Sequence, residues 1–89
     1  MLRPSYTKQF EKDLKRQHKR GKDKKKLTTI LNMLVNKNPL PMKNRDHKLI
    51  EKYTGRRECH IASDWLLIYK ITKTEITFER TGNHSDLFK

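Results

Sequence analysis

The sequence predicts an α+β fold in which a two-helix N-terminal hairpin packs on one face of a small, mainly antiparallel β-sheet. Two observations lead to this prediction. Apolar residues in the first 36 positions recur with the spacing of amphipathic helices, whereas those from position 57 onward alternate as in strands. The 89 residues contain no internal repeat and no Pro/Gly-rich linker, so residues 1–89 are expected to form a single domain.

Two helices are expected in the N-terminal part. The first spans about residues 7–20, where Tyr6, Phe10 and Leu14 form an apolar stripe, and Gly21 ends it. The second begins after Asp23, a suitable N-cap residue, and has a broad apolar face made of Leu27, Ile30, Leu31, Leu34 and Val35. Prolines at positions 39 and 41 prevent its continuation. The short basic turn between the helices predicts an antiparallel hairpin.

The strands are expected mainly in the C-terminal half. Residues 57–62 alternate in polarity, residues 65–71 are strongly apolar, and residues 75–80 (EITFER) alternate again. Residues 46–49 form a short strand or extended segment, and residues 2–5 a weak edge strand. Together these strands supply the sheet that the helices cover.

The turn between residues 62 and 65 decides which side chains share a face of the sheet. If the turn is centred on Ser63 and Asp64, with Ile61 opposite Leu66, the helix-covered face holds Cys59, Ile61, Leu66 and Ile68. The other face then holds His60, Trp65, Leu67 and Tyr69. A three-residue loop would reverse this assignment. With the two-residue turn, the uncovered face carries a histidine and aromatic rings, and it is the expected functional face.

Charge is the strongest compositional signal. The chain has 22 Lys and Arg residues against 10 Asp and Glu residues, and its net charge is +12. Such a surface attracts nucleic acid or an acidic protein partner. The basic charge is densest between residue 15 and residue 26, where eight side chains are the expected contacts to a polyanion, namely Lys15, Arg16, Lys19, Arg20, Lys22, Lys24, Lys25 and Lys26.

Several classes of protein are disfavoured. The longest apolar run, WLLIY, is too short to span a membrane, and the N-terminal MLRPSYTK lacks the apolar stretch of a secretory signal. Cys59 is the only cysteine, which excludes an internal disulfide and fits a reducing cytoplasm. No HxH, HExxH or cysteine-rich spacing supports a metal site. We therefore expect neither a metal nor another cofactor.

Three of the four histidines lie at the ends of expected strands: His47, His60 and His84, whereas His18 lies in the basic helix and is expected to be solvated. Metal-independent RNA cleavage needs a base for the ribose 2′-OH, an acid for the departing 5′-oxygen and cations for the phosphorane. Histidine serves as base or acid near neutral pH, arginine binds phosphate, and aromatic rings stack on bases. From the pattern alone, a ribonuclease and a non-catalytic RNA-binding module are equally supported.

Three segments carry a family resemblance. DHKL at 46–49, RECHIASDWLLIYK at 57–70 and FERTGNHSDLF at 78–88 resemble, in order and spacing, the YafQ branch of the RelE-like toxins. The resemblance covers essentially the whole chain. It implies a RelE-like microbial ribonuclease fold and a type II toxin that cleaves mRNA in the ribosomal decoding site.

The resemblance also implies roles for particular residues. It marks His84 as general acid, His47 or His60 as base, and Asp64 as the group that orients an imidazole or stabilises its charged form. Contacts to RNA are expected from Arg57, Trp65, Arg80 and Phe88.

Partners follow from the same resemblance. They are the ribosome, mRNA and a net-acidic antitoxin encoded in the same operon. The eight basic residues between positions 15 and 26 are then expected to dock on ribosomal RNA. The toxin itself is expected to be a monomer that joins a larger complex with a dimeric antitoxin. Exposed aromatic residues are candidates for the apolar anchor of that complex, namely Trp65, Tyr69 and Phe88.

Overall fold

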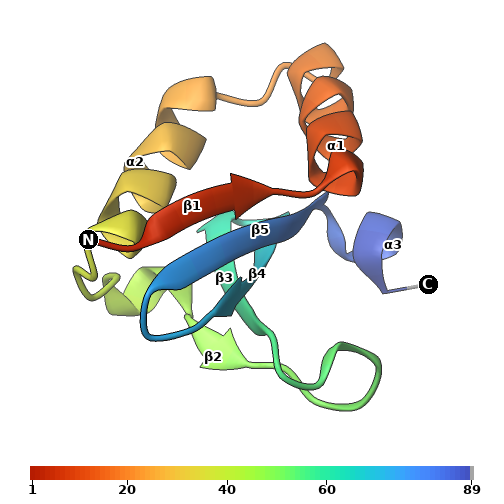
Figure 1. The fold of residues 1–89 in the computed structure, drawn as a ribbon. Coiled ribbons are helices and arrows are strands. Elements are labelled where there is room, and N and C mark those ends of the chain that lie inside the picture. The colour runs from red at the N-terminus through yellow and green to blue at the C-terminus, as the bar shows by residue number, and fades with distance from the viewer. Residues whose placement is uncertain (89) are drawn as a thin grey trace.

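The computed structural model describes residues 1–88 and has two layers, with two helices on one face of a five-stranded sheet (Figure 1). This arrangement confirms the α+β prediction. No helix in the described residues is long and apolar enough to cross a membrane. In chain order the elements are β1 (Arg3–Tyr6), α1 (Lys8–Lys19), α2 (Lys24–Val35), the 3-10 turn η1 (Met42–Asn44), β2 (His47–Lys48), the 3-10 turn η2 (Glu51–Tyr53), β3 (Arg57–Ala62), β4 (Trp65–Ile71), β5 (Glu75–Gly82) and α3 (His84–Leu87).

The strand order is β1-β5-β4-β3-β2. Strand β1 is parallel to β5, and the other neighbouring pairs are antiparallel. The two strands that the sequence indicates least strongly, at 2–5 and 46–49, are both present and form the two edges of the sheet (Figure 1). The short edge strand β2 brings residue 47 beside the beginning of β3.

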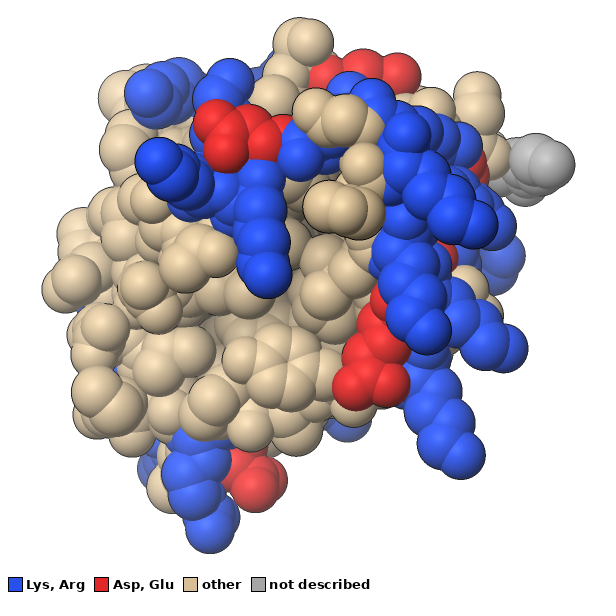
Figure 2. Space-filling model, turned by 90° about the horizontal axis from the view of Figure 1, so that it is seen from above, with Lys and Arg blue, Asp and Glu red and all other residues tan. Residues whose placement is uncertain are grey.

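Side-chain caps explain where the two long helices begin. The Thr7 hydroxyl accepts a hydrogen bond from the Phe10 backbone N–H (3.0 Å) at the start of α1. The Asp23 carboxylate accepts one from Lys25 N–H (2.9 Å) at the start of α2, as predicted. The helices are splayed over the sheet, and a groove of about 520 Å³ lies between them. We call it the interhelical groove, and Figure 2 shows uncharged surface flanked by Lys and Arg on this face of the molecule.

The register of β3 and β4 differs from the prediction. His60 lies opposite Leu66 and Ala62 opposite Trp65, with a β-bulge at residue 61 between these pairs. The expected pairing of Ile61 with Leu66 is wrong, because the extra residue of a bulge reverses which side chains share a face. The core beneath the helices therefore contains Trp65, Leu67 and Tyr69 from β4, packed with Leu2, Phe10, Leu27, Ile30, Leu34, Cys59, Ile61, Ile76 and Phe78.

The second face of the sheet carries a smaller apolar cluster. Leu66 and Ile68, which were expected beneath the helices, pack there against Leu87 of α3, with Leu49 and Tyr53 at the margin. His60 shares this face because it lies opposite Leu66. The histidine is therefore on the uncovered face, as predicted, but its neighbours there are aliphatic rather than Trp65 and Tyr69.

Candidate active site

A buried carboxylate lies between two of the predicted catalytic histidines. Strand pairing places His47 opposite Glu58, and His60 follows two residues later on the same face of β3. Oε1 of Glu58 lies 3.4 Å from Nε2 of His47 and 3.7 Å from Nε2 of His60. The Glu58 side chain is only 6% exposed, whereas that of His47 is 48% exposed. Glu58 is thus placed to orient either imidazole.

The third histidine comes from α3 and has its own carboxylate. Nδ1 of His84 lies 2.8 Å from Oδ1 of Asp64, and the His84 backbone N–H donates to the same oxygen at 3.1 Å. The ring centroids of His60 and His84 are 6.0 Å apart. A phosphate placed between the two rings could form a hydrogen bond of about 3 Å with each of them. All three of the expected catalytic histidines, together with Asp64, therefore lie on one face of the sheet.

The position of His84 is fixed by the way α3 is anchored. Asn83 and Asp86 form a capping box at its start. Arg20 of α1 donates two hydrogen bonds to the Asp86 carboxylate (2.6 and 3.1 Å), and Arg16 lies 3.5 Å from it. Arg16 and Arg20, both expected to dock on the ribosome, therefore have an intramolecular partner.

Glycine at position 82 allows the close approach of α3 to β5. A Cβ added there would lie 2.7 Å from Oδ2 of Asp86, closer than side chains tolerate. Any other residue at this position would push α3 away from the end of β5. The distance between His84 and His60 therefore depends on Gly82 as well as on the Asp86 ion pair.

Aromatic rings border the histidines on one side. Phe88, which is 42% exposed, lies 6.1 Å from the His84 ring and packs edge-on against Tyr53 at 5.6 Å. The Tyr53 hydroxyl donates to the Leu87 carbonyl (3.3 Å), which ties η2 to α3. Phe88 thus presents an accessible ring face beside His84, where a base can stack.

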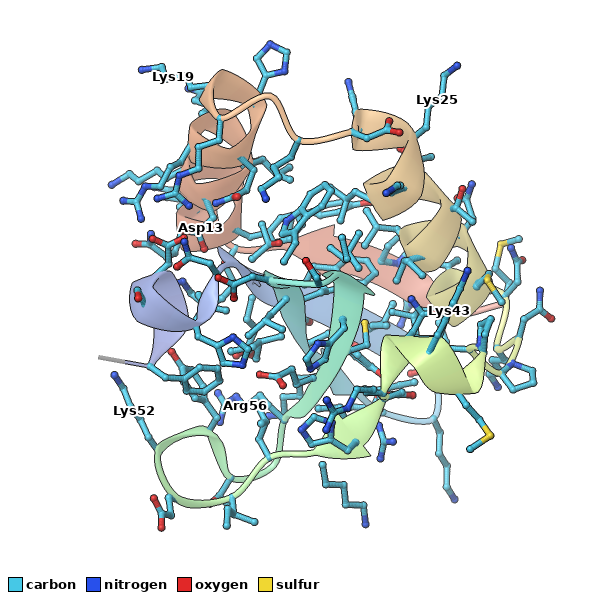
Figure 3. The ribbon with its side chains drawn as sticks, turned by 180° about the vertical axis from the view of Figure 1, so that it is seen from behind. Asp13, Lys19, Lys25, Lys43, Lys52 and Arg56 are labelled. Carbon is cyan, nitrogen blue, oxygen red and sulfur yellow. The ribbon has the colours of Figure 1, made fainter. Side chains whose placement is uncertain are left out.

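Arg80 is the cation that β5 contributes to this face. It pairs with Ile68, which pairs in turn with Glu58, so all three residues lie in one row across the sheet. Its side chain is 24% exposed, and its guanidinium donates two hydrogen bonds to Asp13 of α1 (2.8 and 3.3 Å). Figure 3 shows Asp13 on the side of α1 that faces α3 and the sheet. The ion pair holds the guanidinium in place while part of it remains open to solvent.

Two of the expected RNA-binding residues lie elsewhere. Trp65 is 2% exposed, and its Nε1 donates to the Thr81 hydroxyl (2.9 Å) beneath the helices, so its expected exposure on the histidine face is wrong. Arg57 alternates with His60 along β3 and points to the opposite face, where it donates to Asp46 (3.2 Å). Neither residue joins the histidine cluster.

Some residues of the site were not predicted from the sequence. Glu58 could have been predicted from the sequence. It lies two positions before His60 in an alternating strand, so the two side chains share a face of the sheet. The ion pairs of Asp13 with Arg80 and Asp86 with Arg20 join residues more than 60 positions apart, and no local pattern indicates them. Arg56 likewise pairs with Glu79, 23 positions away, at 2.9 Å.

The environment sets the protonation states of the cluster. Burial lowers the pKa of His60 below its ordinary value of 6.5, although Glu58 acts in the opposite direction, so His60 is neutral at pH 7. The side-chain and backbone hydrogen bonds from His84 lower the pKa of Asp64, which is therefore a carboxylate. Burial raises the pKa of Cys59 to about 12, which excludes a thiolate nucleophile there.

Fold and site together define a small, basic α+β protein with three histidines and their carboxylate partners clustered at the face of the sheet that α1 and α2 leave open. Residues 2–89 match the family model described as a bacterial toxin of type II toxin-antitoxin system, YafQ. The chain belongs to this YafQ family.

Individual relatives are similar over nearly their whole length. The mRNA interferase toxin YafQ of Escherichia coli (strain B / BL21-DE3) is 45% identical over 84 residues, which cover 93% of this chain and 91% of that protein. The crystal structure of YafQ from Escherichia coli strain BL21(DE3) matches with a TM-score of 0.95 at 41% identity, covering 100% of both chains. YafQ in the Escherichia coli DinJ-YafQ complex matches with a TM-score of 0.93 at 42% identity, again over 100% of both chains.

Proposed function

We propose that this protein cleaves mRNA on translating ribosomes, by attack of a ribose 2′-oxygen on the adjacent phosphate. Membership of a toxin family whose 45% identical relative is named an mRNA interferase makes the chain an mRNA-cleaving toxin, an endoribonuclease. The observation that supports the acid–base mechanism best is the pair His60 and His84, 6.0 Å apart on one face, one neutral and the other beside a carboxylate. Such action on translated mRNA would take place in the cytoplasm.

The histidines divide the proton transfers between them. Neutral His60, or His47 beside it, removes the proton of the 2′-OH, and the 2′-oxygen attacks phosphorus in line with the 5′-oxygen. The bond from phosphorus to the 5′-oxygen breaks, and protonated His84 gives its Nε2 proton to that oxygen. The products are a 2′,3′-cyclic phosphate and a 5′-hydroxyl end. The Asp64 carboxylate orients the His84 ring through its contact with Nδ1, which leaves Nε2 directed to the departing oxygen.

Two further residues are assigned to the substrate. Arg80, held by Asp13, stabilises the negative charge that develops on the phosphorane. Phe88 stacks on a base next to the cleaved bond. The ribosome is proposed to hold the mRNA backbone in the in-line geometry, which would complement a small site that is open to solvent.

The basic helices are proposed to supply the affinity for ribosomal RNA. Among the docking residues, Lys24 and Lys25 are exposed, and no salt bridge within residues 1–88 involves them. Reversing both charges (Lys24→Glu with Lys25→Glu) should weaken ribosome binding and reduce its salt dependence by about one unit of log–log slope for each phosphate that is no longer neutralised. Binding is measured by sedimentation with 70S ribosomes at several salt concentrations.

A matched control separates docking from net charge. Lys70 and Lys73 are exposed at the end of the sheet, and their double reversal changes the net charge equally. Equal slopes for the two double variants would mean that the helices are only a solvated surface.

Cleavage is read in translating extracts and on free mRNA. The rival function, a non-catalytic RNA-binding module, requires the wild-type protein to bind ribosomes without producing new mRNA 5′ ends.

The interhelical groove is proposed to bind an acidic antitoxin. Its floor contains Leu14, Leu27, Leu31 and Trp65, and its rim contains Lys15, Lys19, Lys22 and Lys24. No salt bridge in the described part of the chain involves these lysines, and both polar atoms of the buried Gln17 side chain lack a hydrogen-bond partner there. An amphipathic segment with apolar and acidic faces complements such a groove. Antitoxin dimerisation would then give a complex larger than a heterodimer.

The antitoxin proposal is tested with two phenylalanine substitutions on α2. Thr28 is exposed and lines the interhelical groove, so Thr28→Phe fills it, whereas the exposed Asn32 lines no groove and Asn32→Phe is the control. The acidic protein encoded next to this chain should co-purify in high salt with the wild type and with Asn32→Phe. Retention should fall at least about tenfold with Thr28→Phe, since hot-spot contacts in apolar pockets dominate affinity. Equal retention by all three proteins would contradict this site.

A further inference from the structure

We propose that Asp46, held by Tyr69 and Arg57 at the edge of the sheet, is a positioning residue for His47. The contact fixes the His47 ring in the orientation and the tautomer that a general base requires. This inference rests on the proposed function, in which His47 and His60 are the two candidates for the base, and it concerns groups that touch no substrate. It also gives a role to Arg57, whose side chain lies away from the histidine cluster.

His47 lies on an edge strand that its own backbone holds weakly. Strand β2 contains two residues and pairs with β3 on one side (Figure 1). Arg45, two residues before His47, has a left-handed conformation (φ 48°), which is uncommon for residues other than glycine. Such a conformation costs free energy and persists only where the surrounding contacts enforce it. The position of His47 therefore depends on side-chain contacts next to β2.

The Asp46 side chain supplies such contacts. Its Oδ1 accepts a hydrogen bond of 2.6 Å from the Tyr69 hydroxyl and one of 3.2 Å from Nε of Arg57. Arg57 and Tyr69 pair directly across β3 and β4, so both donors belong to strands inside the sheet. Burial and the hydrogen bond to Asp46 raise the pKa of Tyr69, whose hydroxyl therefore stays protonated and donates. Hydrogen bonds to a carboxylate are stronger than those between neutral groups, so Asp46 is tied firmly to the sheet.

This tie acts through the edge of the sheet. His47 lies beside Glu58 on the face that carries the histidines, whereas Asp46 contacts Tyr69, a core residue beneath the helices. With one of two consecutive side chains fixed on the far face, the backbone between them cannot rotate freely. The direction of the His47 ring is therefore set from the face that the helices cover.

The backbone next to Asp46 also decides which nitrogen of His47 carries the proton. Nδ1 of His47 is hydrogen-bonded to the Arg45 carbonyl. A carbonyl oxygen only accepts, so Nδ1 is the donor and holds the proton of the neutral ring. Nε2, on the side of Glu58, then has the free lone pair that takes the proton of the 2′-OH. Release of Asp46 would move the Arg45 carbonyl and remove the preference for this tautomer.

Removal of the Asp46 carboxylate should slow the chemical step. Asp46→Ala deletes both hydrogen bonds at a side chain that is 27% exposed, so the fold should persist. Single-turnover cleavage on programmed ribosomes should fall about tenfold to hundredfold, the effect of a small misplacement of a catalytic group. Asp46→Asn keeps an oxygen that accepts from Tyr69 and should recover most of this loss. Cleavage by Asp46→Ala at the wild-type rate would overturn the inference.

A double-variant cycle separates positioning of His47 from a general structural defect. The rate of the protein with both Asp46→Ala and His47→Ala is compared with that of His47→Ala alone. If Asp46 acts through His47, its replacement has no further effect once the imidazole is absent. The same holds for Arg57→Gln in place of Asp46→Ala. A further loss of rate in the double variants would instead indicate a structural defect or a direct contact with RNA, and would refute the positioning role.

The tautomer of His47 gives a readout that does not depend on cleavage. In the ¹⁵N-labelled wild type, the ring nitrogen shifts of neutral His47 should show the proton on Nδ1. Tyr69→Phe removes the buried donor to Asp46 and should give a mixture of the two tautomers. Tyr6, which is 50% exposed on the opposite edge strand, provides the matched control Tyr6→Phe, with wild-type shifts. Identical His47 shifts in the wild type and Tyr69→Phe would contradict the role of the anchor.

Failure of this inference and failure of the proposed function give different results. Cleavage by His47→Ala at the wild-type rate would leave His60 as the base and remove the role of Asp46, with the proposed function standing. A wild-type protein that cuts no translated mRNA would remove the proposed function. A proton on Nδ1 of His47 that depends on Tyr69 would, in that case, still establish that Asp46 positions the ring.

Discussion

Replacing His84 with alanine should lower the rate of mRNA cleavage by about 10²- to 10⁴-fold, the contribution typical of a positioned general acid. Without the imidazole, the departing 5′-oxygen must take its proton from water. The loss is expected in the chemical step and not in ribosome binding, because His84 lies on α3, away from the exposed lysines of α2. The measurement is single-turnover cleavage of a defined mRNA on programmed ribosomes, with the new 5′ ends mapped.

A control histidine makes this result specific. His18 is exposed on α1, and His18→Ala should cleave at the wild-type rate. His84 has a side-chain exposure of 59%, so its replacement should leave the fold intact, as circular dichroism can verify. Cleavage by His84→Ala at the wild-type rate would exclude His84 from the mechanism, and another group would have to protonate the departing oxygen.

The helices and strands were predictable because their signals are local. The period of Phe10 and Leu14, the N-cap Asp23 and the alternation in residues 57–62 each fall within one element. Two features were missed because they depend on contacts distant in sequence. The two-residue turn at Ser63 and Asp64 is as expected, but the bulge at Ile61 was not foreseen. It places Trp65 in the core, where its ring nitrogen contacts Thr81, 16 residues away. The short helix α3 is held by Arg20, 66 residues from Asp86.

The candidate site was predicted in part for a similar reason. His47, His60 and His84 each lie at or near the end of an element, where a small sheet brings distant groups together. Their convergence did not require the correct register. The face assigned to Trp65 did depend on the register. A shift of one residue in the pairing of β3 with β4 moves this side chain from the open face of the sheet into the core. Glu58 was overlooked because a carboxylate in a strand is more often a surface charge than a buried partner of histidines.

Replacing Glu58 with glutamine should lower the pKa of His60 further and slow cleavage at least about tenfold, because the proposed base would become weaker and its ring less well oriented. Burial lowers the pKa of His60, and Glu58 opposes this effect. Glutamine has nearly the same shape but no charge, so the opposing effect disappears while packing is retained. NMR titration of the His60 ring should show the shift directly, and Glu51→Gln, at an exposed carboxylate of η2, should show none.

The pH dependence of cleavage distinguishes a positioning role for Glu58 from a purely structural one. A general base acts only in its neutral form, so the rate rises with pH through the pKa of the base. With Glu58→Gln this rise should move to lower pH, while the maximal rate decreases because a weaker base transfers the proton less readily. A structural defect would lower the rate at every pH without moving the profile. An unchanged His60 titration together with an unchanged pH profile would contradict the role of Glu58 and favour His47, which is more exposed, as a base that acts without it.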